Sequence, residues 1–113
     1  MGRAAPTATS RYAEIVQALS ARPDVAVGAG RKKGFGASAL AVRGRIFAML
    51  ASGDRFVVKL PKTRVEELVA AGAGAPFDSG RGRVMKEWLV VAERGADWQE
   101  LAEEARAFVA TSS

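Results

Sequence analysis

The chain has 113 residues, about the size at which one hydrophobic core closes, so its length predicts a single domain over residues 1–113. Apolar residues make up 49% of the sequence and charged residues 26%, which is typical of globular domains and argues against disorder. With no cysteine and no histidine, the chain lacks thiolate nucleophiles, disulfides, iron-sulfur ligands and the commonest metal ligand and general base. We therefore expect no enzymatic activity, no cofactor and no metal ion.

No apolar run approaches the ~20 residues of a transmembrane helix, and residues 1–10 lack the apolar stretch of a signal peptide. These features predict a cytoplasmic protein without a membrane partner. The charge is uneven, because residues 1–65 hold 12 Lys/Arg against 3 Asp/Glu, whereas residues 66–113 hold 5 against 9. A basic half can attract a phosphate backbone or an acidic partner, although interleaving of the two halves in the fold can remove this asymmetry from the surface.

The chain begins with residues of low complexity, and we expect a mobile leader over residues 1–8. A helix is predicted over residues 10–21, since its apolar residues recur at helical spacing and Pro23 ends it. A short apolar run at residues 25–27 then leads into a glycine-rich basic stretch, which is the least regular part of the sequence.

Three strand-like runs follow at residues 37–42, 45–51 and 55–60. Arg43-Gly44 and Gly53-Asp54 separate them, and glycine supplies the positive φ that two-residue hairpin turns need. We therefore predict an antiparallel β-meander.

Two-residue turns fix the register of this meander, with Val42 opposite Arg45 and Ser52 opposite Arg55. The larger apolar side chains then share one face, which we expect to be the core: Leu40, Val42, Phe47, Met49, Phe56, Val58 and Leu60. The second face collects smaller side chains, a candidate partner face: Ala39, Ala41, Ile46, Ala48, Leu50 and Val57. Because such a strip is too large to leave exposed on a monomer, we expect either the last helix or a second copy of the chain to cover it.

Thr63 and Glu66 have the spacing of a capping box, which predicts a second helix that Gly72 ends. Residues 73–83 have the composition of a Gly/Pro loop, and residues 84–92 indicate a strand or a broken strand pair. Asp97 and Glu100 repeat the capping-box spacing before a last helix. Its apolar stripe comprises Trp98, Leu101, Ala102, Ala105, Phe108 and Val109. Its acidic residues Glu100, Glu103 and Glu104 would face Arg55 and Lys59 if this helix covered the second face.

Two groups of cations lie among glycines and are candidate contacts for an anion or a nucleic acid: Arg31, Lys32 and Lys33 in the first, and Arg81, Arg83 and Lys86 in the second. Backbone N–H groups of a glycine-rich turn can cradle a phosphate that such side chains neutralise. The stretch 28–36 nevertheless matches neither the dinucleotide-binding fingerprint nor the P-loop, since Ala39 stands where a glycine is required and glycine follows Lys33. A solvated connection is the alternative reading of both groups.

The remaining polar residues suggest no catalytic constellation. Asp54 and Asp78 have the positions of turn residues, and a serine without histidine would need a lysine base that nothing places beside it. The other candidates considered were Glu87, Ser38, Ser52, Thr63 and Ser79. We therefore assign no catalytic, cofactor-binding or metal-binding residue.

Five stretches carry a resemblance to a known family: Gly34–Gly36, Val42–Ala48, Val57–Leu60, Ala75–Phe77 and Gly82–Met85. In these stretches the chain resembles the TfoX amino-terminal domain family, related to the YjbR-like proteins, and the resemblance covers residues 9–110. It implies an α+β fold with the order α-β(3)-α-β(2)-α, of the secretion-chaperone-like kind, and it brings no catalytic residue.

Together these features predict a non-enzymatic protein-interaction or regulatory module that acts through surface contacts with a protein partner or a second copy of itself. The alternative is weak, non-specific nucleic-acid binding through the two groups of cations, in a transcription-associated role. A small molecule bound between the sheet and the helices is a third reading of the same sequence.

Overall fold

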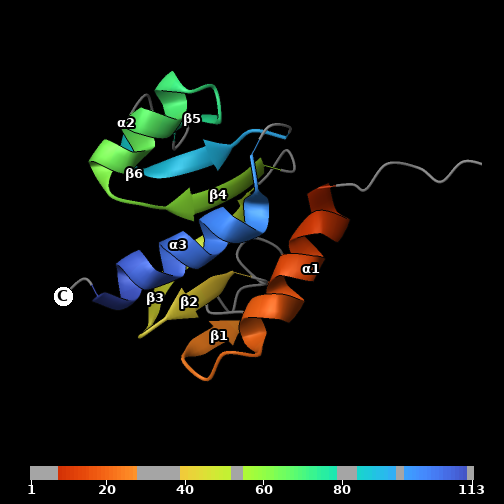
Figure 1. Cartoon of the computed structure of the whole chain (residues 1–113). Helices are drawn as coiled ribbons and strands as arrows, with labels where there is room; N and C mark the ends of the chain where they lie inside the picture. The colour runs from red at the N-terminus through yellow and green to blue at the C-terminus, as the bar shows by residue number, and fades with distance from the viewer. Residues whose placement is uncertain (1–7, 28–38, 52–54, 79–83, 94–95, 112–113) are drawn as a thin grey trace, which may run out of the picture.

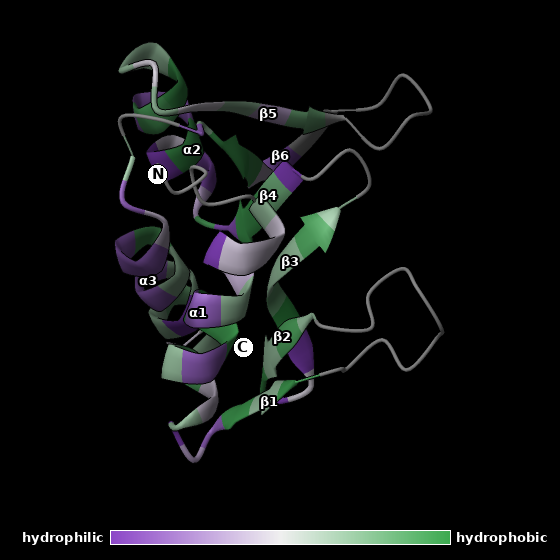
Figure 2. Ribbon diagram, turned by 90° about the vertical axis from the view of Figure 1, so that its right-hand side faces the viewer, coloured by the Kyte–Doolittle hydropathy of each residue, from purple (hydrophilic) through white to green (hydrophobic). Residues whose placement is uncertain are grey.

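The computed structural model describes residues 8–27, 39–51, 55–78, 84–93 and 96–111. The elements in this part of the chain, in order, are α1 (Ala8–Ser20), β1 (Val25–Val27), β2 (Leu40–Val42), β3 (Arg45–Ala51), β4 (Arg55–Lys59), α2 (Lys62–Ala70), β5 (Gly74–Asp78), β6 (Val84–Val91) and α3 (Trp98–Thr111) (Figure 1). The strands form one antiparallel sheet in the order β1-β2-β3-β4-β6-β5. All three helices lie on the same face of it (Figure 2). The expected α+β class is confirmed, with four strands rather than three before α2.

The two longer helices form where the apolar spacing predicted them. α1 buries Tyr12, Ile15 and Leu19, which lie on one side of the helix. α3 buries all of its predicted stripe except Phe108, which is half-buried against the same core. At its start, the carboxylate of Asp97 accepts a hydrogen bond from the backbone N–H of Glu100 at 3.0 Å, as a capping residue should.

The start of α2 was predicted wrongly and its end correctly. Pro61 rather than Thr63 is the N-cap, and no side chain caps the first turn. Proline is favoured here because its missing N–H and fixed φ cost nothing at a helix start. At the other end Gly72 has a φ of 78°, and Ala73 donates its backbone N–H to the carbonyl of Leu68 at 2.8 Å. This pattern is a Schellman motif, which favours glycine at the left-handed position.

Residues 73–83 were predicted to form a loop, but Gly74–Asp78 is strand β5. The composition is misleading because β5 is an edge strand, where proline is tolerated. Packing explains why residue 74 is a glycine, since a Cβ at this position would lie 2.5 Å from the carbonyl oxygen of Val90. The strand is therefore built from residues that, by composition alone, favour a turn.

The predicted register holds for the two pairs next to the first turn and fails beyond them and in the second hairpin. Val42 pairs with Arg45 as expected, and the ladder then shifts by one residue, so that Ala41 pairs with Ile46 but Leu40 pairs with Ala48. In the second hairpin Ala51, not Ser52, pairs with Arg55. A one-residue slip moves side chains to the other face of a sheet.

Because of this slip, some β3 residues lie on the face of the sheet opposite to the one predicted. Ala48 and Leu50 belong to the helix-covered side, where Ala48 is part of the core and Leu50 packs against it. Met49 moves the other way, since it pairs with Val57. Of the candidate partner face, Ala41, Ile46 and Val57 keep their predicted side.

The core lies between the sheet and the helices α1 and α3. Its centre is Phe56, whose ring stacks on Trp98 with centroids 4.6 Å apart and lies 5.8 Å from the ring of Tyr12. α3 therefore covers the large apolar face, and the expectation that it covers the second face was wrong. Its acidic residues instead pair with Arg22 and Arg64, as described below.

Candidate functional site

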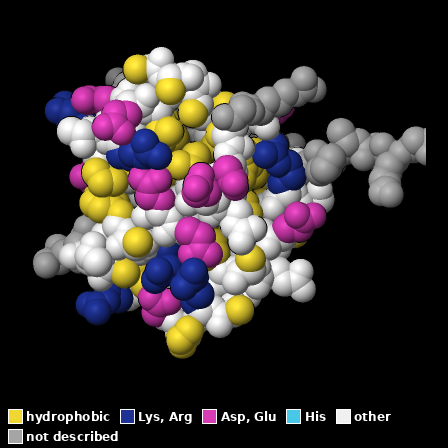
Figure 3. Space-filling model, in the orientation of Figure 1, with side chains coloured by type: hydrophobic (Ala, Val, Ile, Leu, Met, Phe, Trp, Pro, Cys, Tyr) yellow, Lys and Arg dark blue, Asp and Glu magenta, His cyan; other side chains and the backbone are white. Residues whose placement is uncertain are grey.

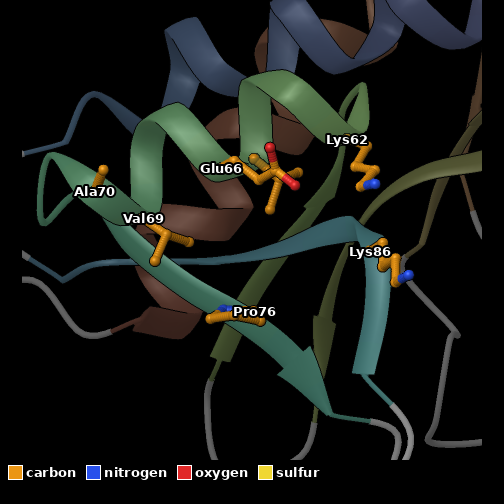
Figure 4. A pocket seen from close by; sticks show the side chains of 7 residues that line it. Lys62, Glu66, Val69, Ala70, Pro76 and Lys86 are labelled. Atoms are coloured by element: carbon orange, nitrogen blue, oxygen red, sulfur yellow. The ribbon is translucent and has the colours of Figure 1, made fainter.

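A groove runs along α2 on the helix-covered side of the sheet and has a volume of about 470 Å³. One wall is a stripe of α2 at helical spacing: Lys62, Val65, Glu66, Val69 and Ala70. The other wall comes from the neighbouring hairpin, with Pro76 on β5 and Lys86 on β6 (Figure 4). The groove therefore joins residues that are up to 24 positions apart in the sequence.

The two ends of the groove differ in chemistry. Val69, Ala70 and Pro76 line the end where α2 finishes, and Val65 forms part of the buried core beneath it. Lys62 and Lys86 lie together at the end where α2 begins (Figure 4). Both lysines are exposed, and Glu66 lies between the two ends on the α2 wall. An apolar floor with cations at one end is suited to an amphipathic ligand.

α2 is held in place from its other side. The guanidinium of Arg64 donates to both carboxylate oxygens of Glu104 on α3, from Nε at 2.8 Å and from Nη2 at 3.3 Å, and to Glu67 at 3.1 Å. The hydrogen bonds to Glu104 and Glu67 raise the pKa of Arg64 above its ordinary value. This fork-shaped pair orients α2 relative to α3 and so fixes one wall of the groove.

The edge of the sheet beside the groove is poorly suited to pair with another strand. The carbonyl of Ala73 accepts a hydrogen bond from the N–H of Ala92 at 2.8 Å, so this carbonyl points toward β6. Backbone groups alternate along a strand, which directs those of Gly74 and Pro76 to the open edge. Proline has no N–H to donate there. A partner would therefore contact this region through side chains in the groove rather than by adding a strand.

Of the six cations predicted as nucleic-acid or anion contacts, the structure describes Lys86, which lines the groove. Arg31, Lys32 and Lys33 fall outside the described residues, in the connection from β1 to β2; Arg81 and Arg83 fall outside them too, in the connection from β5 to β6. These two pairs of strands form opposite edges of the sheet.

The face of the sheet opposite the helices carries the rest of the candidate partner face. Ala41 and Val57 are buried there, Ile46 is half-buried, and Ala39, which precedes β2, is buried. On this face Lys59 lies over the ring of Trp88, 5.7 Å from its centroid, and Arg55 lies over the ring of Phe77 at 5.4 Å. Each aromatic side chain is half-buried and faces a cation, which is a favourable electrostatic contact.

The charge asymmetry of the sequence does not appear on the helix-bearing face, where acidic and basic side chains lie intermixed (Figure 3). Ion pairs join the basic and acidic halves of the chain. Arg22 contacts Glu103 at 2.7 Å, and Asp24 contacts Arg106 at 2.9 Å, in addition to the Arg64–Glu104 pair. Two cations of the first half, Arg22 and Arg64, are therefore paired with acidic residues of α3.

The other candidates form no reactive arrangement in the part of the chain that is described. Thr63 is exposed on α2, and Glu87 lies 4.0 Å from Lys59. Asp54, Ser38, Ser52 and Ser79 lie outside the described residues, and Asp78 ends β5 instead of forming a turn. Within the same ranges no three His, Cys, Asp or Glu residues gather as metal ligands would, and none of the helices is long and apolar enough to cross a membrane.

The sequence does not predict the groove, although the α2 wall can be recognised in it. The stripe from Lys62 to Ala70 has clear helical spacing. The wall formed by the β5–β6 hairpin was not predicted, because Pro76 was assigned to a loop and Lys86 was interpreted only as a surface cation. Comparison of the chain with protein-family models, with curated proteins and with solved structures gave no match.

Proposed function

We propose that the chain is a protein-interaction module that binds an apolar segment of a partner protein in the groove between α2 and the β5–β6 hairpin. The observation that carries this proposal is the groove itself, an apolar hollow of about 470 Å³ that is open at the surface. The apolar stripes of α1 and α3 are buried in the core, whereas α2 buries only Val65 among its residues. Partner segments often anchor a few apolar side chains in such grooves.

The size of the groove suits a weak and reversible interaction. Burial of one leucine-sized side chain contributes about 1.5–3 kcal/mol, so two such side chains anchored in the groove would contribute about 3–6 kcal/mol. Part of this is lost again when the partner segment becomes ordered. The expected dissociation constants therefore lie between roughly 100 μM and 10 mM, the range of weak, transient contacts.

A non-enzymatic role in the cytoplasm and membership of the TfoX amino-terminal domain family, with its secretion-chaperone-like fold, are parts of the same proposal. They are supported by the five resembling stretches and by the absence of a reactive constellation among the described residues. A regulatory module needs a binding surface and no chemistry, and the groove is such a surface.

A peptide library displayed on phage tests the proposal without knowledge of the partner. Peptides selected on the wild-type protein should bind at least tenfold more weakly to Ala70→Lys, which places a charged chain in the groove. The matched control is Val27→Lys, a similar change at an exposed residue of β1 on the far edge of the sheet, which should bind as the wild type does. Failure to select any peptide, or equal losses in both variants, would contradict the proposal.

The same two variants identify the case in which the partner is a second copy of the chain. Light scattering would then show a dimer for the wild type and for Val27→Lys, and a monomer for Ala70→Lys. Circular dichroism confirms that each variant is folded.

Weak, non-specific binding of single-stranded nucleic acid is the second candidate, favoured by the Lys59–Trp88 and Arg55–Phe77 pairs on the opposite face of the sheet. Aromatic rings beside cations can stack on bases while the charge contacts phosphate. Fluorescence anisotropy with a labelled oligothymidylate tests it, and binding should weaken steeply with added salt. Absence of binding at low salt would remove this candidate.

A further inference from the structure

We infer that the segment bound in the groove carries an acidic residue at one end, held between Lys62 and Lys86, so that the partner is an acidic–apolar peptide. This inference rests on the proposed function and adds the chemistry of the ligand to it. It is carried by the juxtaposition of two lysines from different elements at one end of an apolar groove (Figure 4).

The two lysines differ from the other cations on the helix-bearing side. Arg22, Arg64 and Arg106 each form an ion pair with an acidic residue of the fold, and Arg11 donates to the backbone carbonyl of Glu93 at 2.7 Å. Lys62 and Lys86 form none with any acidic side chain that the structure describes, although Glu66 lies one turn from Lys62 on the same stripe. Two neighbouring like charges without a partner create a positive potential that complements a carboxylate.

The position of Glu66 gives the ligand a polarity. A carboxylate bound beside Glu66 would be repelled, so the acidic group is confined to the lysine end and the apolar side chains to the end with Val69 and Pro76. The nine residues of α2 span about 13 Å, which equals about four residues of extended peptide. Alternate residues of an extended segment face the same side. The matching pattern is therefore an acidic residue followed, in one chain direction, by apolar residues two and four positions away.

Three short peptides test this pattern: acetyl-Glu-Ala-Leu-Ala-Leu-amide and its counterparts with Gln or Lys in place of Glu, each also in reversed order. Their binding is followed by NMR chemical-shift titration of the labelled full chain. For the better chain direction, we expect the Glu peptide to bind about five- to tenfold more tightly than the Gln peptide, since each exposed ion pair contributes about 0.2–1 kcal/mol. The shifts should centre on Val69 and Ala70.

Charge substitutions separate recognition from folding. The double variant Lys62→Gln and Lys86→Gln should lose the preference for Glu, and Lys62→Glu with Lys86→Glu should reverse it in favour of the Lys peptide. The matched control, Arg43→Gln with Arg45→Gln, removes the same charge from exposed residues of the β2–β3 turn and should keep the preference. Glu66→Gln should strengthen binding of the Glu peptide about twofold.

The outcomes distinguish this inference from the proposed function. Equal binding of all three peptides in the groove would overturn the inference and leave the proposed function intact. Binding of none of them, or shifts confined to another surface, would also overturn it, and the library selection then decides whether the proposed function is wrong as well. Tighter binding of an oligothymidylate at the two lysines than of the Glu peptide would overturn it in favour of a phosphate ligand. An amidated peptide that binds as tightly as its free acid shows that the side-chain carboxylate, rather than a chain terminus, is recognised.

Discussion

The region built by α1 and α3 and the region built by α2 use the same sheet in different ways. α1 and α3 bury most of their apolar stripes around Phe56, whose ring stacks on Trp98 and meets the ring of Tyr12 at a tilt of 55°. α2 is nine residues long and buries only Val65; Leu68 and Val69 are half-buried against the core, and Val69 and Ala70 also line an open groove. The first region therefore contributes most of the hydrophobic stabilisation, and the second leaves apolar surface for a partner.

This difference indicates that the length of a helix determines how much of its apolar stripe is buried in the core. The fourteen residues of α3 extend across β2, β3 and β4, so its stripe meets the core along its whole length. α2 packs only on β5 and β6 and depends on its ion pair with Glu104 for its orientation. Substitutions in the α1–α3 region should therefore mainly lower stability, whereas substitutions in the α2 region should mainly weaken binding.

The largest expected effect is in the core. Phe56→Ala should lower the free energy of unfolding by about 3–5 kcal/mol, because it removes a fully buried ring and leaves a cavity. Val69→Ala in the groove should cost only about 0.5–1.5 kcal/mol while weakening peptide binding. Urea unfolding followed by circular dichroism measures both, with Phe56→Leu as a folded substitute if the alanine variant fails to fold. Equal losses in the two regions would refute the comparison.

Gly74 should be the most sensitive residue of the α2 region. Gly74→Ala places a Cβ 2.5 Å from a backbone oxygen, which cannot move easily, and should cost about 1–3 kcal/mol. Gly72→Ala meets no atom within 4 Å and suffers only from its φ of 78°, so it should cost about 1 kcal/mol. Thermal unfolding ranks the two variants, and a larger loss at Gly72 would show that the contact between β5 and β6 is looser than described.

Because of Tyr12, the stability of the core region should decrease at alkaline pH. Burial raises the pKa of its phenol above the ordinary value near 10, while its hydroxyl contacts the carbonyl oxygen of Ala48 at 3.5 Å. Because the folded-state pKa is the higher one, stability is unaffected below pH 10 and decreases above it, by up to about 1.4 kcal/mol per pH unit. Tyr12 is the single tyrosine of the chain, so tyrosinate absorbance reports on it alone. Ionisation near pH 10 without unfolding would show that the phenol is accessible, and Tyr12→Phe should remove this contribution to the alkaline loss.

The smallest effect on stability is expected at the ion pair between Arg64 and Glu104, which links the two regions. Arg64→Gln removes a half-exposed ion pair and should lower stability by about 0.5–1 kcal/mol, with a smaller loss in high salt. Lys62→Gln, on the same helix, breaks no ion pair with a described residue and should change stability by less than about 0.5 kcal/mol. Urea unfolding at two salt concentrations checks both. A salt-independent loss at Arg64 would point to packing of its side chain instead.

The sequence predicts the core region well and the groove poorly, for a physical reason. The stripes of α1 and α3 and the cap at Asp97 are local patterns, which a single segment reveals. The groove needs β5, whose Gly74 and Pro76 resemble a loop until the neighbouring strand explains them. The same limit explains the face of the sheet that was assigned wrongly, since the shift at Phe47 depends on which residues pair across strands.

The capping of α2 shows how a local pattern can also mislead. Thr63 and Glu66 have the right spacing, but the N-cap is Pro61, two residues earlier. The true signal was the proline, which is suited to a helix start. Lys86 was singled out for its charge, and only the fold revealed that it lines the same groove as Lys62.

The two tryptophans are divided between the two regions, which makes the protein its own fluorescent reporter. Trp98 is buried against Phe56 and donates its indole N–H to the carbonyl oxygen of Ala92 at 2.9 Å. Trp88 lies on β6, two residues from Lys86, and is partly exposed. Its emission should therefore lie at longer wavelength and be quenched more readily by a solute such as iodide. Single-tryptophan variants would then follow the unfolding of the core and changes on the opposite face of the sheet separately, without any attached dye.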